Sequence, residues 1–204
     1  MKPAIKAPLT RGYRKKERTR RQLLSAGLRV LREKGESFKP RDVIEEAGVS
    51  TGTYYNYFAD TDLLIDEIMR EELLKITSAT ASGTIDDPAL RIAVSATQIL
   101  RRTLEDPLIA RFVLRLLYRP GQHNQMTRFL REDLTEGFET GRFTYGPDDS
   151  TLDLASGLLI MTIHRITAGA IADNFIVMMV VRLLEALGIP REEAERLAEV
   201  APSY

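Results

Sequence analysis

Apolar residues recur at helical spacing along almost the whole chain, and runs that alternate apolar and polar residues, as strands do, are scarce. Between Arg14 and Lys34 the apolar positions fall on a single stripe, which consists of Leu23, Leu24, Gly27, Leu28 and Leu31. Gly35 follows as a stop signal. The pattern predicts an all-α protein with about nine to ten helices.

The segments that follow this first helix are short and sharply bounded. Pro40 suits the first turn of a helix, and Gly48 suits the left-handed turn that ends one. Ser50 is a good cap for the next helix, and either Asp60 or Thr61 caps the one after it. We therefore expect helices over residues 40–47, 51–58 and 61–77.

Turn-rich stretches that read SGTIDDP, RPGQHNQ and FTYGPDDS divide the rest of the chain. The apolar spacing predicts helices near residues 88–104, 106–118, 125–140, 148–170 and 174–187, followed by an amphipathic segment, PREEAERLAEV. The stretch FIVMMVVRLL is apolar on nearly every face, so a helix there needs cover on two sides. Half of an intermolecular four-helix bundle would provide that cover, and a central helix within a monomer is the alternative.

Charge is unevenly distributed, although the formal net charge is zero. Residues 1–59 hold 14 Lys and Arg against 6 Asp and Glu, whereas the remainder holds 15 against 23. A basic module on an acidic body favours a polyanion as the partner of the basic part, although solvated basic faces are also common.

Composition argues against several kinds of chemistry. The chain has no cysteine and only two histidines, so we expect no metal site, no cofactor and no catalytic triad. The pairs Asp86–Asp87 and Asp148–Asp149 lie just before predicted helices, where capping explains them better than catalysis. No phosphate-binding glycine loop or nucleophile motif is present, so we expect no enzyme. The basic start lacks the apolar core of an export signal and no uncharged run is long enough to span a membrane, which favours the cytoplasm.

Two of the short helices, joined by AGVS, have the dimensions of a helix-turn-helix. In the second of them Tyr54 and Phe58 lie four residues apart and can point together into a core. Another face carries small or polar residues, as contact with base edges and phosphates requires. Those residues are Thr51, Gly52, Thr53, Tyr55 and Asn56.

The stretch DVIEEAGVSTGTYYNYFADTDLL resembles the signature of the TetR family of bacterial transcriptional regulators. The resemblance implies a helix-turn-helix DNA-binding domain at residues 14–60 and an effector-binding and dimerisation domain at residues 61–204, after a disordered basic tail at residues 1–13. It also implies a homodimer on a palindromic operator, usually a repressor, that a small-molecule effector releases by moving the fourth helix. An all-helical adaptor, or a small-molecule-binding protein without sequence-specific DNA binding, is the alternative.

Carried over residue by residue, the family motif implies a set of contacts to double-stranded DNA. Tyr55 and Tyr57 would send their hydroxyls to phosphates, and Arg41 would reach a guanine or a phosphate. The full set is Lys15, Lys16, Arg18, Lys39, Arg41, Thr51, Gly52, Thr53, Tyr55, Asn56, Tyr57 and Thr61. Three positions depart from the family pattern: Thr61 replaces a usual lysine, Lys39 a usual threonine or serine cap, and Ile44 a usual alanine.

The larger domain is expected to hold the effector and the dimer interface. Apolar walls with a few polar groups are typical of ligand sites, and the candidates are Phe112, Leu116, Tyr118, Met126, Phe129, Met161 and His164. The candidates for the dimer interface are Leu158, Arg165, Gly169, Phe175, Met178, Val181 and Arg182.

Overall fold

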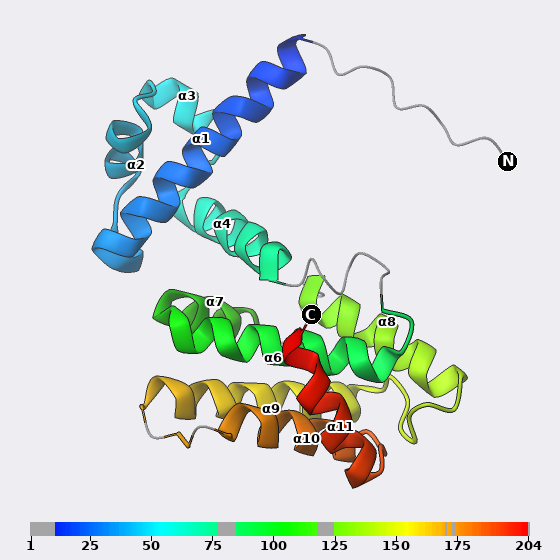
Figure 1. Cartoon of the computed structure of the whole chain (residues 1–204). Coiled ribbons are helices and arrows are strands. Elements are labelled where there is room, and N and C mark those ends of the chain that lie inside the picture. Colours follow the sequence, from blue (N-terminus) through cyan, green and yellow to red (C-terminus); the bar gives the residue numbers. More distant parts are fainter. Residues whose placement is uncertain (1–10, 77–84, 118–124, 170, 173, 204) are drawn as a thin grey trace, which may run out of the picture. The chain divides into compact units, whose positions relative to one another are not determined.

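The structure of the protein, a computed structural model, describes residues 11–76, 85–117, 125–169, 171–172 and 174–203 (Figure 1). Within these ranges it contains helices and no strands, which confirms the all-α prediction. The chain divides into two compact units, residues 1–71 and 72–204, and the division falls inside helix α4. Over the described ranges, none of the helices combines the length and the apolar character needed to cross a membrane.

The first unit starts with a long helix and continues through three shorter ones (Figure 1). Its elements are α1 (Arg11–Lys34), the 3₁₀ turn η1 (Gly35–Ser37), α2 (Pro40–Ala47), α3 (Thr51–Tyr55) and α4 (Thr61–Ile76). Residues 11–13, expected in the tail, are helical, and residues 1–10 lie outside the described residues. α3 ends three residues earlier than expected, because the N–H groups of Tyr57 and Phe58 both bond to the carbonyl of Tyr54 and the chain tightens into a turn.

The N-terminal half of α4 packs against α1. A Cβ atom at Gly27 of α1 would lie only 2.8 Å from Cδ1 of Ile68, so the missing side chain lets the two helices approach closely. Arg20 of α1 also bonds to Glu67 and, at 3.3 Å, to Glu71. The first unit therefore includes the beginning of α4, whereas the expected boundary between residues 60 and 61 placed this helix wholly in the second domain.

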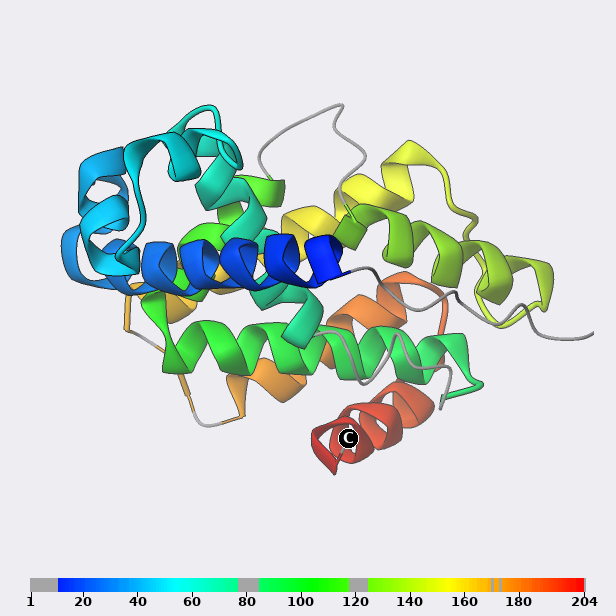
Figure 2. The same ribbon diagram turned by 90° about the horizontal axis from the view of Figure 1, so that it is seen from above.

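The second unit is built around α6 (Pro88–Glu105), which contacts each of its other described α-helices. These are α7 (Pro107–Leu117), α8 (Gln125–Glu139), α9 (Asp149–Thr167), α10 (Phe175–Ala186) and α11 (Arg191–Val200), with the 3₁₀ turn η2 (Ala201–Ser203) at the end. Figure 2 shows α8 and α11 on either side of α6. Because other helices of the unit pack around α6, most of its apolar side chains are buried.

Both acidic pairs cap helices, as the sequence predicts. The Asp87 carboxylate accepts a hydrogen bond of 2.9 Å from the Ala89 N–H at the start of α6. The Asp148 carboxylate accepts one of 2.8 Å from the Thr151 N–H at the start of α9. Each therefore satisfies one of the backbone donors that a helix N-terminus leaves unpaired.

Arg142 links the start of α6 to α11. Its guanidinium donates to Asp87 at 2.8 and 2.9 Å and lies 2.9 Å from Glu193. Burial alone raises the pKa of Asp87, but the hydrogen bonds from Arg142 and from the Ala89 N–H outweigh it and lower that pKa below its ordinary value of 3.8. Because the folded-state pKa is depressed, the stabilisation is present above about pH 4 and is lost as the pH falls through the folded-state pKa.

Asp87→Asn should lower stability at neutral pH and flatten its decline in acid. Asparagine keeps the capping acceptor but removes the charge that Arg142 pairs with. Urea unfolding midpoints between about pH 3 and about pH 7 measure the effect. The control is Asp86→Asn, which removes the same charge from the exposed neighbouring residue. An acid decline as steep in Asp87→Asn as in the unmodified protein would contradict this role of the Asp87–Arg142 pair.

Candidate nucleic-acid interface

The connection between α2 and α3 has the turn that the sequence predicts. Gly48 adopts φ = 62°, in the left-handed region, and its N–H donates to the carbonyl of Glu45 at 3.2 Å. Ser50 then caps α3, because its hydroxyl accepts a hydrogen bond of 3.1 Å from the Thr53 N–H. α2 and α3 thus form the two helices of a helix-turn-helix.

The aromatic residues after Ser50 separate into buried and exposed side chains. Tyr54 is 0% exposed and Phe58 is also buried, which confirms the prediction that these two point into the core. Tyr55 is 51% exposed, and its ring packs edge-on against Tyr54 with the centroids 5.3 Å apart. Tyr57 is half-buried. The buried pair therefore fixes the backbone that presents Tyr55 to solvent.

The start of α2 compensates for its unusual cap. Lys39 has no side chain that can accept a hydrogen bond, but its own N–H donates to the Asp42 carboxylate at 2.7 Å. Pro40, at the first helical position, has no N–H to satisfy. The Lys34 ammonium binds the other Asp42 oxygen at 2.6 Å, and this bond is the largest influence that lowers the pKa of Asp42. Asp42 therefore supplies the N3 half of a capping box, and its own N–H donates to the carbonyl of Lys39 at 2.9 Å.

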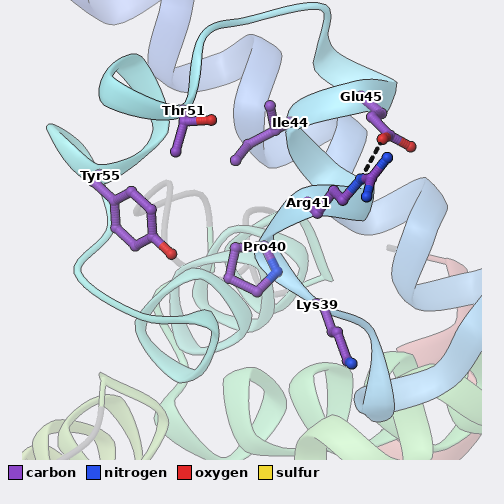
Figure 3. Close-up of a pocket in the computed structure, with 7 residues that line it drawn as sticks. All are labelled: Lys39, Pro40, Arg41, Ile44, Glu45, Thr51 and Tyr55. Atoms are coloured by element: carbon purple, nitrogen blue, oxygen red, sulfur yellow. Dashed lines mark hydrogen bonds and ion pairs between the residues drawn. The ribbon is translucent and has the colours of Figure 1, made fainter.

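α2 and α3 enclose an open hollow of about 440 Å³ on the surface of the first unit (Figure 3). It is lined by Lys39, Pro40, Arg41, Ile44, Glu45, Thr51 and Tyr55. Tyr55 and Thr51 lie on one side and Arg41 and Glu45 on the other, with Pro40 and Ile44 between them. Four of the expected contact residues, Lys39, Arg41, Thr51 and Tyr55, are thus brought to one place.

The other expected contact residues on and after α3 differ in how accessible they are. Gly52 and Asn56 are exposed, and a Cβ atom at Gly52 would meet nothing within 4 Å, so the backbone there is open to a partner. Thr53 is half-buried, with its hydroxyl 2.8 Å from that of Ser50. Thr61 is half-buried at the start of α4, where Asp60 is the cap, because its carboxylate accepts a 2.8 Å hydrogen bond from the Leu63 N–H. Thr53 is therefore engaged within the helix cap.

The basic residues of α1 lie on its exposed surface. Lys15, Lys16 and Arg18 are all exposed near the start of the helix. Glu17, the acid among them, is paired with Arg21 at 3.1 Å. This end of α1 therefore presents several positive charges that a polyanion can reach.

Three residues that line the hollow, Pro40, Ile44 and Glu45, are not among the contact residues expected from the sequence. Ile44, which stands where the family usually has alanine, is half-buried and supplies apolar surface. Glu45 was not singled out, yet its carboxylate accepts a 2.6 Å hydrogen bond from Nε of Arg41. The spacing of four residues between an arginine and a glutamate on one helix is the signal that indicates this pair.

In the second unit the expected effector residues that the structure describes differ in burial, so they do not line a single cavity wall. Phe112 is buried in α7, and Leu116 and Phe129 are half-buried. Met161 is 60% exposed and His164 is also exposed, so neither side chain lines the interior of this unit. Tyr118 lies outside the described residues, as does the side chain of Met126.

Most of the expected interface residues share an exposed stripe on α9 and α10. Leu154, Leu158, Met161 and Arg165 recur at helical spacing on α9, and Phe175, Met178 and Arg182 do so on α10. All seven are at least partly exposed, α9 and α10 contact each other, and Gly169 is exposed just beyond α9. Val181 requires a correction: it is 2% exposed, because it lies on the face of α10 that packs into its own unit.

Comparison with known proteins identifies the family. Residues 87–200, more than half of the chain, match a family model described as "Tetracyclin repressor-like, C-terminal domain". The chain therefore belongs to the TetR family of transcriptional regulators. Members of this family are non-enzymatic transcription factors that bind DNA and small molecules and act as dimers. A search among curated proteins finds no match.

Solved structures of similar fold agree with this assignment. RolR in complex with the ligand resorcinol is 27% identical, with a TM-score of 0.66 over 91% of this chain and 95% of RolR. The transcriptional regulator FadR from Bacillus subtilis, in complex with stearoyl-CoA, is 18% identical, with a TM-score of 0.62 over 83% and 99%. A TetR family regulator from Marinobacter aquaeolei VT8 is 17% identical, with a TM-score of 0.62 over 85% and 97%. The last two similarities concern the fold alone.

Proposed function

We propose that this protein is a cytoplasmic, ligand-responsive repressor that binds a palindromic operator as a homodimer and is released by a small-molecule effector. The hollow between α2 and α3 carries the proposal. It combines two basic side chains, Lys39 and Arg41, with the exposed Thr51 and Tyr55 on a helix-turn-helix. Such a surface suits phosphates at its rim and base edges within it.

In this proposal each group of exposed residues contacts a different part of the DNA. Tyr55 and Tyr57 donate to phosphates, and Lys15, Lys16 and Arg18 supply charge to the backbone or the minor groove. Thr51 and Gly52 enter the major groove, where the bare backbone at Gly52 permits close approach. Arg41 reaches a base edge from the start of α2.

The stripe on α9 and α10 supports the homodimer. Large apolar side chains that gather on the surface of a protein commonly mark an interaction site. Leu154 and Met161 lie on one helical face and Met178 on the neighbouring helix, so two copies related by a two-fold axis would bury the same surface twice. Two-fold symmetry requires two recognition helices on a palindromic site.

The effector is expected to bind among the helices of the second unit. The similarity to RolR, whose structure contains resorcinol, supports a small organic ligand, and Phe112, Leu116 and Phe129 provide apolar wall. The first part of α4, residues 61–71, belongs to the first unit, and the rest of the helix belongs to the second. Arg20 of α1 binds the first part of α4. An effector that moves α4 would therefore carry the helix-turn-helix with it, and a coupling of about 1–3 kcal/mol would change operator affinity about 5- to 150-fold.

Binding measurements on purified protein test this function. Affinity for a site selected from random DNA should fall on the order of 10³-fold between about 50 and about 200 mM salt, because phosphate contacts release counterions. It should exceed affinity for random sequence by about 10³-fold or more. Organic compounds that raise the Tm should include one that releases the site. Equal affinity for selected and random DNA would favour the adaptor alternative, and stabilising compounds that never change DNA binding would contradict the effector role.

A further inference from the structure

An acidic side chain stands in the surface that we propose faces DNA. Glu45 lines the hollow together with Arg41, one turn apart on α2 (Figure 3). Its Oε1 accepts a hydrogen bond of 2.6 Å from Nε of Arg41, and both side chains are largely exposed. A carboxylate at this place repels phosphates, so its presence in a DNA-binding surface needs a reason.

Folding does not supply that reason. Glu45 and Arg41 belong to the same helix and are exposed, and ion pairs of this kind contribute little to stability. Other acids attach α2 to its surroundings: Asp42 binds Lys34 and the Lys39 N–H, and Glu46 binds Arg29 of α1 at 2.6 Å. Glu45 makes no such link to another element among the described residues.

The geometry of the pair suits base recognition. The Nε–H group of Arg41 donates its hydrogen bond to Glu45. Within the described part of the chain, Arg41 makes no other hydrogen bond. The terminal nitrogens Nη1 and Nη2 therefore stay available side by side, and such a pair of donors matches O6 and N7 of guanine. Holding the long arginine side chain in one orientation also reduces the conformational entropy lost on binding.

We propose that Glu45 is a positioning residue that directs Arg41 to a guanine in the major groove and disfavours phosphate contacts there. The inference rests on the proposed DNA-binding function. It predicts that Glu45 raises the specificity of the protein while lowering its affinity for DNA of any sequence. Glu45 itself contacts Arg41 rather than the operator.

Three variants separate this role from a general effect of charge. Glu45→Ala should reduce the preference for guanine at one position in each half-site about 5- to 10-fold and raise affinity for random DNA about 2- to 5-fold. Glu45→Gln keeps an acceptor for Nε, so it should retain most of the guanine preference while still binding random DNA more tightly. Glu46→Ala, which removes an equal charge one residue along α2, should leave the guanine preference unchanged. Binding is measured on the selected site, on its single-base variants and on random DNA.

The background variant Arg41→Ala provides the decisive comparison. In that background Glu45→Ala should no longer change base preference, because the residue it positions is absent. A persisting change would mean that Glu45 reads a base itself, and equal effects of Glu45→Ala and Glu46→Ala would mean that charge alone matters; either result overturns the inference. If the unmodified protein selects no DNA site, the proposed function and this inference fail together. If the unmodified protein selects a palindrome and Glu45→Ala shows the same guanine preference on it, only this inference fails.

Discussion

Tyr55→Phe should weaken binding to every DNA sequence by about ten-fold or more without changing the order of base preferences. The variant removes a hydroxyl from a side chain that is 51% exposed and keeps the ring that packs edge-on against Tyr54. A hydrogen bond to a charged group contributes about 1.5–3 kcal/mol, and about 1.4 kcal/mol is ten-fold in affinity. Because phosphates carry no direct sequence information, the loss should be uniform.

Titrations of the selected site and of random DNA measure this effect. Tyr145→Phe, at an exposed tyrosine of the second unit, is the matched control and should bind as the unmodified protein does. Thr51→Ala provides the contrast, because an exposed residue of the hollow that meets base edges should alter preference at one or two base pairs. If Tyr55→Phe lost affinity only for the selected site, Tyr55 would contact a base and not a phosphate.

Met161→Glu should convert the proposed dimer into folded monomers. Met161 is 60% exposed within its own chain, so a glutamate there does not disturb the core of the monomer. In the proposed dimer it would bury a carboxylate on this stripe, and removing that charge from water costs several kcal/mol even with Arg165 four residues further along α9. A cost of about 3 kcal/mol corresponds to a more than 100-fold weaker dimer. Operator affinity should fall with it, because one monomer holds only one half-site.

Sedimentation velocity and far-UV circular dichroism together measure this outcome. Leu104→Glu on α6 is the matched control, since it places the same charge at a residue that is 52% exposed but lies off the stripe. Val181→Glu should instead destabilise the fold, because Val181 is buried within its own unit. A Met161→Glu protein that remains dimeric would place the interface elsewhere.

The helix-turn-helix could be predicted closely from the sequence because its signals are local. Gly48 and Ser50 mark the turn and the next cap, and the spacing of Tyr54 and Phe58 determines which aromatic residues are buried. The end of α3 was predicted less well, since residues 56–58 keep an apolar spacing although the backbone has already tightened into a turn. The hydrogen bond from the Lys39 N–H to Asp42 was not predicted either, because it depends on a side chain that reaches back from the third position of the helix.

The second unit could be predicted only as far as its helices. The stretch that forms α10 is apolar on nearly every face, so periodicity does not distinguish the face toward α6 and α11 from the face toward a partner. Val181 was therefore assigned to the wrong side. Met161 was assigned to an interior wall because methionine is apolar, yet it continues the exposed stripe of Leu154 and Leu158. Such choices depend on tertiary packing, which a single sequence does not contain.

Selection of bound DNA from a random pool tests the central claim most directly. The account predicts enrichment of a palindrome whose half-sites are separated by about one helical turn or a multiple of it, because a two-fold dimer carries two copies of α3. It also predicts that Met161→Glu no longer enriches the paired half-sites. A pool that stays random after selection, or a single enriched site without two-fold symmetry, would contradict the claim that this protein is a dimeric operator-binding regulator.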